Sequence, residues 1–259
     1  MEFVVVIPAR FASVRLPGKP LLLIAGKPMI QHVHERALES GATKVVIATD
    51  DERVFRVATD FGAEAVMTGT HHRSGTERLA EVVEVLQLPD DTVVVNLQGD
   101  EPLVPASLIR QVAMAAHQQS AAVATLCTPI QNPAELFEPQ VVKVIRDVNG
   151  YGAYFSRAPI PWDRDGFVGR SALGEGDTAP QALRMPYYRH IGLYAYRASF
   201  IRAYHTLSPS PWEQLESLEQ LRVLYHGWRI FVEEAAVPPL PGVDTLADLE
   251  RVRAQFASH

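Results

Sequence analysis

Three cations follow the first apolar run of the chain closely enough to bind one anion. Arg10, Arg15 and Lys19 lie within ten residues, directly after the run 3–7. A glycine among them lets the backbone approach a ligand, and two prolines restrict the loop before anything binds. Fixed cations with exposed backbone N–H groups are what a triphosphate needs. The stretch therefore predicts a phosphate-binding loop, with a solvated basic turn as the alternative.

The two best-known phosphate-binding patterns are missing from this sequence. Neither G-x-x-x-x-G-K-[ST] nor G-x-G-x-x-G occurs. The first is typical of P-loop nucleotide-binding proteins and the second of dinucleotide-binding proteins. The basic loop can therefore hold phosphates without indicating a P-loop kinase or a dehydrogenase.

A second candidate for chemistry is Asp100, in the stretch "NLQGDEP". It comes directly after the apolar run 92–97, so a strand there would place its carboxylate at the carboxyl edge of a sheet. Mg²⁺ takes oxygen ligands and keeps several waters, which suits a carboxylate beside a glycine. The alternative is an aspartate that only stabilises a turn.

Strand and helix patterns alternate around these residues. Short β-branched or small apolar runs, typical of strands covered on both faces, occur at 3–7, 44–49, 64–67, 92–97 and 121–125. Helical spacing follows Ser74-x-x-Glu77, follows Pro105, and follows Thr245-x-x-Asp248 near the end. The pattern predicts an α/β fold with a doubly wound, mostly parallel sheet, in which ligands sit outside the carboxyl ends of the strands.

The regular alternation loosens after residue 141. Prolines and a Gly/Asp-rich span at 163–179 precede a strand-like stretch at 187–196 and a helical one at 211–225. We expect a single domain over residues 1–259. Within it, strands and loops at 141–196 should extend the sheet and form a lid over one side.

Composition excludes several classes of protein. The 259 residues include 24 Lys and Arg against 30 Asp and Glu, a formal net charge of −6, which argues against a broad nucleic-acid surface. Cys127 is the sole cysteine, so no intrachain disulfide can form, and a reducing compartment is the natural expectation. We find neither a signal peptide nor a membrane span, and expect a cytoplasmic protein without membrane insertion.

Several blocks together resemble one enzyme family. The sequence is similar to 3-deoxy-manno-octulosonate (Kdo) cytidylyltransferases, which belong to the Rossmann-like, nucleotide-diphospho-sugar transferase type of nucleotidyltransferase. In the order of that family, and over nearly the whole chain, the blocks are "IPARFASVRLPGKPL", "HRSGTERLAEV", "NLQGDEPL", "YFSRAPIPWDRD", "RHIGLYAYR", "EQLRVL" and "PGVDTLADLERVR". CMP-sialic acid synthetases share the fold, but their loop is closer to R-x-G-S-K-G.

The resemblance implies an activity and a set of partners. CTP and Kdo would give CMP-Kdo and diphosphate, for lipopolysaccharide biosynthesis, in a homodimeric enzyme that uses Mg²⁺. Residues 141–225 would be the sugar-binding lid and the dimerisation portion. Val14 departs from the family, because a small hydroxyl residue is often found there.

The resemblance also implies which residues form the site. The catalytic set would be Arg10, Lys19, Asp100 and Asp244, with Asp100 and Asp244 as the metal ligands. The nucleotide set would be Pro8, Ala9, Arg10, Arg15, Lys19, Ser74, Gly75, Arg78 and Gln98, with the Gln98 amide suited to a cytosine edge. The sugar set would be Arg157, Arg164, His190, Tyr194, Glu219 and Gln220, in which arginines suit a carboxylate.

Each assignment has a structural alternative. Asp244 directly precedes a helix cap and could only complement the helix dipole, and a lone His190 beside an apolar strand is more often a satisfied structural residue. For the whole chain, the alternatives are a cytidylyltransferase for 8-amino-Kdo or a sialic-acid-like sugar, a non-catalytic nucleotide-binding module, or a glycosyltransferase. The last would commonly carry D-x-D where this chain has Gln98-Gly99-Asp100.

Overall fold

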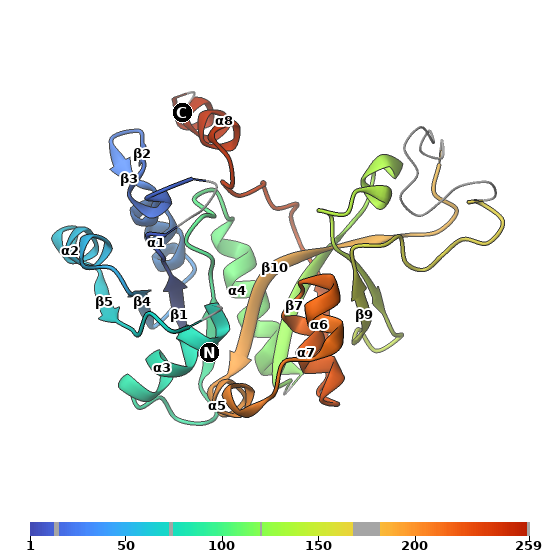
Figure 1. The fold of residues 1–259 in the computed structure, drawn as a ribbon, viewed down its shortest axis with the longest axis horizontal. Coiled ribbons are helices and arrows are strands. Elements are labelled where there is room, and N and C mark those ends of the chain that lie inside the picture. The colour runs from blue at the N-terminus through green and yellow to red at the C-terminus, as the bar shows by residue number, and fades with distance from the viewer. Residues whose placement is uncertain (13–15, 73–74, 120, 168–181, 258–259) are drawn as a thin grey trace.

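The structure is a computed structural model, which describes residues 1–12, 16–72, 75–119, 121–167 and 182–257. A nine-stranded sheet runs through the described residues in the order β11-β7-β10-β6-β1-β4-β5, with β8 and β9 attached to β10 (Figure 1). Its strands are β1 (Phe3–Pro8), β4 (Lys44–Thr49), β5 (Glu64–Met67), β6 (Val93–Asn96), β7 (Val123–Pro129), β8 (Lys143–Arg146), β9 (Gly152–Ser156), β10 (Tyr188–Arg197) and β11 (Ile230–Glu234). A separate two-stranded sheet pairs β2 (Leu23–Ile24) with β3 (Lys27–Pro28).

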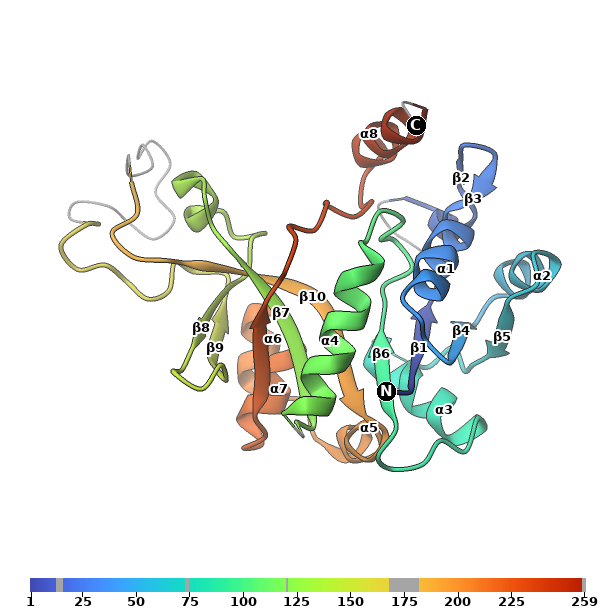
Figure 2. The same cartoon turned by 180° about the vertical axis from the view of Figure 1, so that it is seen from behind.

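Helices cover both faces of the large sheet (Figures 1 and 2). The α-helices are α1 (Met29–Glu39), α2 (Glu52–Asp60), α3 (Gly75–Val85), α4 (Ala106–Gln118), α5 (Ala198–Thr206), α6 (Pro211–Glu216), α7 (Gln220–Tyr225) and α8 (Leu246–Ala257). Two short 3-10 helices, η1 (Lys19–Leu21) and η2 (Pro133–Phe137), lie in loops.

The two faces of β1 enter different parts of the core. Val5 and Ile7 belong to a core cluster that includes side chains of α1, α2 and α4, whereas Val4 and Val6 belong to one that includes side chains of α3, α5 and α7. Because β1 is buried on both faces, it is apolar at successive positions and does not alternate. This arrangement confirms the predicted doubly wound α/β fold.

Antiparallel pairings of β10 make the main path of the sheet mixed. β1 is parallel to β4 and β6, and β4 is parallel to β5, but β10 lies antiparallel between β6 and β7. The register of β10 against β7 shifts between Ile191 and Tyr194. The Thr125 hydroxyl lies 3.0 Å from the Ile191 carbonyl oxygen and 2.8 Å from that of Leu193, so it helps to satisfy the irregular backbone.

The region after residue 141 extends the sheet as expected. β8 pairs antiparallel with both β10 and β9, which carries the sheet outward beyond its main path. The prediction of one helical stretch at 211–225 is wrong in one respect, because the structure has two helices there, α6 and α7. The break is at Ser217, whose φ of 50° is left-handed and cannot continue a helix.

No α-helix among the described residues combines the length and the apolar content that crossing a bilayer would require. Cys127 is buried and unpaired, as expected for a core residue.

Candidate functional site

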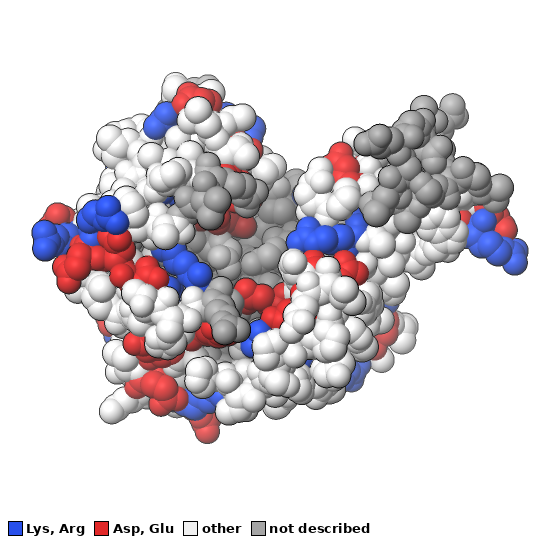
Figure 3. All heavy atoms as spheres, in the orientation of Figure 1, with Lys and Arg blue, Asp and Glu red and all other residues white. Residues whose placement is uncertain are grey.

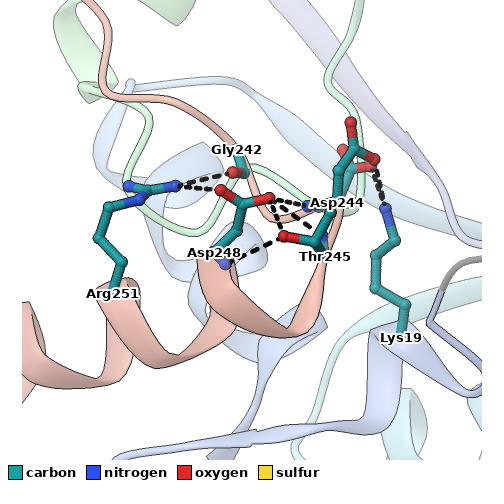
Figure 4. Close-up of polar contacts among 7 residues, drawn as sticks. Lys19, Gly242, Asp244, Thr245, Asp248 and Arg251 are labelled. Atoms are coloured by element: carbon teal, nitrogen blue, oxygen red, sulfur yellow. Dashed lines mark hydrogen bonds and ion pairs between the residues drawn. The ribbon is translucent and has the colours of Figure 1, made fainter.

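Lys19 joins two acidic residues that are far apart in the sequence. Its Nζ donates to Asp100 Oδ2 at 2.8 Å and to Asp244 Oδ1 at 3.0 Å. Figure 4 shows the Lys19 side chain pointing up toward Asp244, which precedes α8. The predicted metal-binding aspartates therefore face one common cation position, at the carboxyl edge of the sheet.

A close backbone approach brings the C-terminal segment to this place. Val243 N donates to the Asp100 carbonyl oxygen at 2.9 Å, so the segment before α8 crosses the loop after β6. A Cβ on Gly242 would lie 3.0 Å from that same carbonyl oxygen, tighter than ordinary contacts. A residue without a side chain is therefore favoured at Gly242.

The start of α8 fixes the residue that follows Asp244. Thr245 N donates to Asp248 Oδ2 at 3.0 Å, and Asp248 N donates to Thr245 Oγ1 at 3.2 Å. This is the predicted capping box (Figure 4). Asp244 N also donates to Asp248 Oδ2, at 3.2 Å, so the Asp248 carboxylate fixes the backbone on which Asp244 is carried.

The charges at this place perturb one another. Burial alone would lower the pKa of Lys19, but the Asp100 and Asp244 carboxylates outweigh it and hold the pKa above its usual value. The ammonium therefore stays charged. Burial raises the pKa of Glu101 to about 7, and the charges of Asp100 and Asp244 act in the same direction. A third full negative charge is thus disfavoured beside the two aspartates.

The residues at this place fit a magnesium ion. Mg²⁺ is characteristically bound through one or two carboxylates, with waters and phosphate oxygens completing its octahedral shell. Asp100 and Asp244 supply two carboxylates within 3.0 Å of one cationic nitrogen. Among the described residues no group of three or more His, Cys, Asp or Glu side chains could hold a metal on its own. A metal at Asp100 and Asp244 would therefore take its other ligands from water or a bound phosphate.

A cavity of about 230 Å³, here the loop cavity, opens beside Lys19. It lies at the carboxyl ends of β1 and β6, where an open α/β sheet is expected to bind its ligand. Its lining includes most of the predicted nucleotide set and one of the metal-binding pair: Pro8, Ala9, Arg10, Ala12, Lys19, Pro20, Gly75, Gln98, Gly99 and Asp100.

A second cavity of about 300 Å³, here the tyrosine cavity, adjoins the first. Gly75 and Gln98 line both. Figure 3 shows this face of the molecule hollowed between its two halves, with basic and acidic side chains inside the hollow. The residues lining the tyrosine cavity are Gly75, Thr76, Asn96, Gln98, His190, Gly192, Tyr194, Tyr196, Tyr204, Ser217, Leu218, Glu219, Gln220 and Val223.

Buried polar atoms without partners converge on the tyrosine cavity. Asn96 Oδ1, Tyr194 OH, Tyr204 OH and Gln220 Nε2 are buried and make no hydrogen bond in the structure. Leaving a buried polar group unsatisfied costs about 1–3 kcal/mol. Four such atoms around one cavity indicate a ligand with several hydroxyl or carboxylate groups that would satisfy them.

His190 is neutral in this setting. Burial lowers its pKa to about 3, and its Nε2 lies 3.0 Å from Thr125 Oγ1. A neutral imidazole can hydrogen-bond a carboxylate but adds no positive charge. The prediction that His190 belongs to a ligand site agrees with its place in the cavity lining.

The break between α6 and α7 brings Glu219 to the tyrosine cavity. Ser217, Leu218 and Glu219 lie between the two helices, and all three line the cavity. Thr76 Oγ1, on α3, donates to Glu219 Oε2 at 3.3 Å. The left-handed backbone at Ser217 ends α6 before Glu219. Glu219 therefore lies in the connection between the helices, where it lines the tyrosine cavity.

Three predicted arginines lie elsewhere. Arg78 is fully buried, donates to Asp50 Oδ2 at 2.7 Å and also to Thr68, and lines neither cavity. Arg157 donates to the carbonyls of Glu216, Pro139 and Ser217. Arg164 is 90% exposed and pairs with Asp165. Arg15 and Ser74, with the capping box expected at Ser74, lie outside the described residues.

Other residues at the site were not predicted. Asn96, Thr76, Gly192, Tyr196 and Tyr204 line the tyrosine cavity. Asn96 carried a usable signal, because it is a polar residue at the end of the buried strand β6. Tyr204 carried none, since its place on the apolar face of α5 looks like an ordinary core position.

Comparison with known proteins agrees with this geometry. The cytidylyltransferase family profile matches residues 4–230. The chain is 57% identical over 254 residues to the 3-deoxy-manno-octulosonate cytidylyltransferase of Histophilus somni strain 129Pt, covering 98% of each chain. It is 56% identical over 259 residues to the enzyme of that name from Haemophilus influenzae strain 86-028NP, covering 100% of both.

Solved structures give the same picture. A CMP:2-keto-3-deoxy-manno-octonic acid synthetase complexed with CTP superposes with a TM-score of 0.87 at 43% identity, covering 100% of this chain and 99% of the other. A 4-diphosphocytidyl-2C-methyl-D-erythritol synthase superposes with a TM-score of 0.63 at 14% identity, covering 98% of each. The second likeness supports the fold alone.

Proposed function

Because the chain belongs to the cytidylyltransferase family, and matches its Kdo-specific members over the full length, we infer that it is a 3-deoxy-manno-octulosonate cytidylyltransferase. It converts CTP and Kdo to CMP-Kdo and diphosphate. The resemblance found in the sequence blocks is confirmed, and the glycosyltransferase alternative is excluded by the same comparisons.

The observation that carries the mechanism is the pair of adjoining cavities. The loop cavity contains Arg10 and Lys19, and the tyrosine cavity contains buried polar atoms in need of partners. A triphosphate suits the first and a polyhydroxy acid the second. Gly75 and Gln98 line both, so the cavities join, and the α-phosphorus and the sugar hydroxyl would meet beside Gly75.

The reaction is an in-line displacement at the α-phosphorus of CTP. The anomeric oxygen of Kdo forms the new P–O bond and loses its proton, while the bond to diphosphate breaks. Arg10 and Lys19 would hold the triphosphate and stabilise charge on the departing diphosphate, and Gln98 would contact the cytosine edge. Positioning and charge neutralisation account for most of the rate enhancement in such transfers.

Asp100 and Asp244 would hold Mg²⁺, which when bound would neutralise phosphate oxygens and orient them for displacement. The fit rests on both carboxylates facing the Lys19 ammonium, at 2.8 and 3.0 Å. Binding of the triphosphate would give Lys19 a new anionic partner and release both carboxylates for the metal.

The sugar would be bound largely by neutral hydrogen-bonding groups. Among the described residues, no Lys or Arg lines the tyrosine cavity. His190, Tyr194 and Gln220 would donate to the Kdo carboxylate and hydroxyls, while Glu219 would accept from hydroxyls. Arg157 and Arg164 would not contact the sugar, because the Arg157 guanidinium donates to the Glu216 carbonyl and that of Arg164 pairs with Asp165.

Residues 141–225 would form the sugar-binding side and the contact between two copies. In support, this portion supplies most of the lining of the tyrosine cavity. It also exposes Trp212, Leu215 and Tyr225, at 41%, 86% and 46%. Apolar side chains gathered on one surface favour association. Light scattering coupled to gel filtration would test the dimer, and a monomer at micromolar concentration would refute it.

The activity is tested by diphosphate release. The purified protein, with CTP and Mg²⁺, should release diphosphate only when Kdo is added, and CMP-Kdo should appear in equal amount. CTP binding without turnover would instead identify a non-catalytic nucleotide-binding module. Faster release with 8-amino-Kdo or a sialic acid would reassign the acidic sugar.

A further inference from the structure

In the loop cavity, a backbone carbonyl orients the guanidinium group of Arg10. Arg10 Nη2 donates to the backbone carbonyl oxygen of His72 at 2.5 Å, across 62 residues of sequence. A backbone carbonyl orients the guanidinium and leaves its positive charge in place. A carboxylate in the same position would neutralise that charge. The charge of Arg10 therefore stays available to an anion in the cavity.

The carbonyl is itself fixed through a buried side chain. His72 is 7% exposed, and its Nε2 lies 2.5 Å from Glu81 Oε2. The same Glu81 oxygen accepts from Gly69 N at 2.9 Å. One carboxylate thus holds residues 69–72 at both ends, and with them the carbonyl that orients Arg10.

Glu81 lies on a rigid support. It is carried by α3, whose Leu79, Val82 and Val83 are fully buried in the core against the sheet. The same helix begins at Gly75, which lines both cavities. The chain of contacts from Glu81 through His72 to Arg10 therefore connects the core to the loop cavity.

We propose that Glu81 is a positioning residue for the cytidylyl transfer, acting through His72 on the guanidinium of Arg10. The inference deepens the proposed function and depends on it for the role of Arg10. Glu81 contacts neither cavity, so its effect should be transmitted wholly through Arg10. The competing explanation is that Glu81 only braces the loop for stability.

A double-mutant cycle separates these explanations. Glu81→Ala should raise the KM for CTP about tenfold, corresponding to loss of a preorganised contact, while the KM for Kdo changes less than about twofold. In an Arg10→Ala background, Glu81→Ala should change the KM for CTP by less than about twofold. An equal tenfold effect in both backgrounds, or a lowered Tm with unchanged KM, would overturn the proposal.

Further variants keep the test decisive. Glu81→Gln retains an oxygen that can accept from both donors, and should restore the KM for CTP to within about threefold of the original. His72→Phe keeps the ring and the backbone carbonyl but removes the donor, and should reproduce Glu81→Ala. If Glu81→Ala does not fold, the proposal is still contradicted by a His72→Phe variant whose KM for CTP does not rise about tenfold, or by a Glu81→Gln variant whose KM rises more than about threefold.

The matched control is Glu84→Ala. Glu84 lies on the same helix, is 65% exposed and pairs with Arg202 at 2.7 Å, so its loss should leave the KM for CTP unchanged. Failure of the proposed function is recognised separately, as absence of diphosphate release by the original protein. Calorimetric CTP binding, measured on the same set of variants, would then still decide whether Glu81 acts through Arg10.

Discussion

Lys19 Nζ lies 3.0 Å from Asp244 Oδ1, although 225 residues separate the two in sequence. The same nitrogen reaches Asp100 at 2.8 Å. A single ammonium thus occupies the place between the two carboxylates that would hold Mg²⁺. In the catalytic complex the Lys19 ammonium would bind a phosphate group of CTP instead. Lys19 would therefore pair with the two carboxylates before CTP binds and with the triphosphate afterwards.

The first prediction concerns the carboxylates. Asp100→Asn should lower kcat at least about 100-fold, because an amide is a poor ligand for Mg²⁺ and leaves phosphate charge uncompensated. Steady-state diphosphate release checks this, with circular dichroism to verify folding. Glu250→Gln is the control, since Glu250 lies on α8, is 61% exposed and pairs with Arg253, and it should leave kcat unchanged. Unchanged kcat in Asp100→Asn would remove Asp100 from the mechanism.

The second prediction concerns competition between Lys19 and the metal. Lys19→Met removes the ammonium that the two aspartates bind, so Mn²⁺ used in place of Mg²⁺ should bind the nucleotide-free protein about tenfold more tightly. Electron paramagnetic resonance of free Mn²⁺ measures this without turnover. The same variant should bind CTP at least about tenfold more weakly. Weaker Mn²⁺ binding in Lys19→Met would show that the carboxylates do not share one cation position.

The third prediction uses a glycine to fill the tyrosine cavity. A Cβ on Gly192 would meet no atom within 4 Å, so a methyl group can be added there without a clash. Gly192→Ala and Gly192→Val should raise the KM for Kdo in that order, by several-fold and then by roughly tenfold or more, as the cavity fills. Calorimetric CTP binding should be unchanged in both. An equal loss of CTP and Kdo binding would mean that the two cavities are not separate sites.

The fold could be predicted from the sequence where a strand is buried on both of its faces. β4 has the expected bounds, since a strand buried on both faces produces a short apolar run bounded by polar residues. β5 also has the expected bounds, although Glu64 and Met67 are exposed at the edge of the sheet. α1 was not predicted, because two of its buried positions are His32 and His34, which obscure the apolar periodicity. The antiparallel insertion of β10 between β6 and β7 was also beyond the sequence, since an apolar strand pattern does not specify its partners.

The site was predictable where a residue follows a strand. The loop cavity contains Arg10, Lys19 and Asp100, each placed by the end of β1 or β6. Arg78 looked equally suitable at a helix start, but its guanidinium is buried against Asp50 and Thr68. Helical phase decides such cases, and a boundary uncertain by one residue changes the face by about 100°. The place of Tyr204 at the site could not be predicted from the sequence, because a buried position that lines a cavity has the same helical spacing as an ordinary core position.

The last prediction is a pH dependence carried by His190. Burial lowers its pKa in the folded protein to about 3, below the ordinary value near 6.5. The folded state therefore favours the neutral ring. Its contribution to stability is fully present above pH 6.5 and is lost progressively as the pH falls toward 3.

His190→Gln removes the imidazole, and with it this pH-dependent contribution to stability, and keeps a polar side chain beside Thr125. The free energy of unfolding of the original protein should fall more steeply than that of His190→Gln between pH 6.5 and pH 5, by on the order of 1 kcal/mol. Urea unfolding at both pH values measures the difference, and the other titrating groups cancel because both proteins share them. Parallel slopes for His190→Gln and the original protein would show that folding does not lower the pKa of His190, and would contradict the prediction.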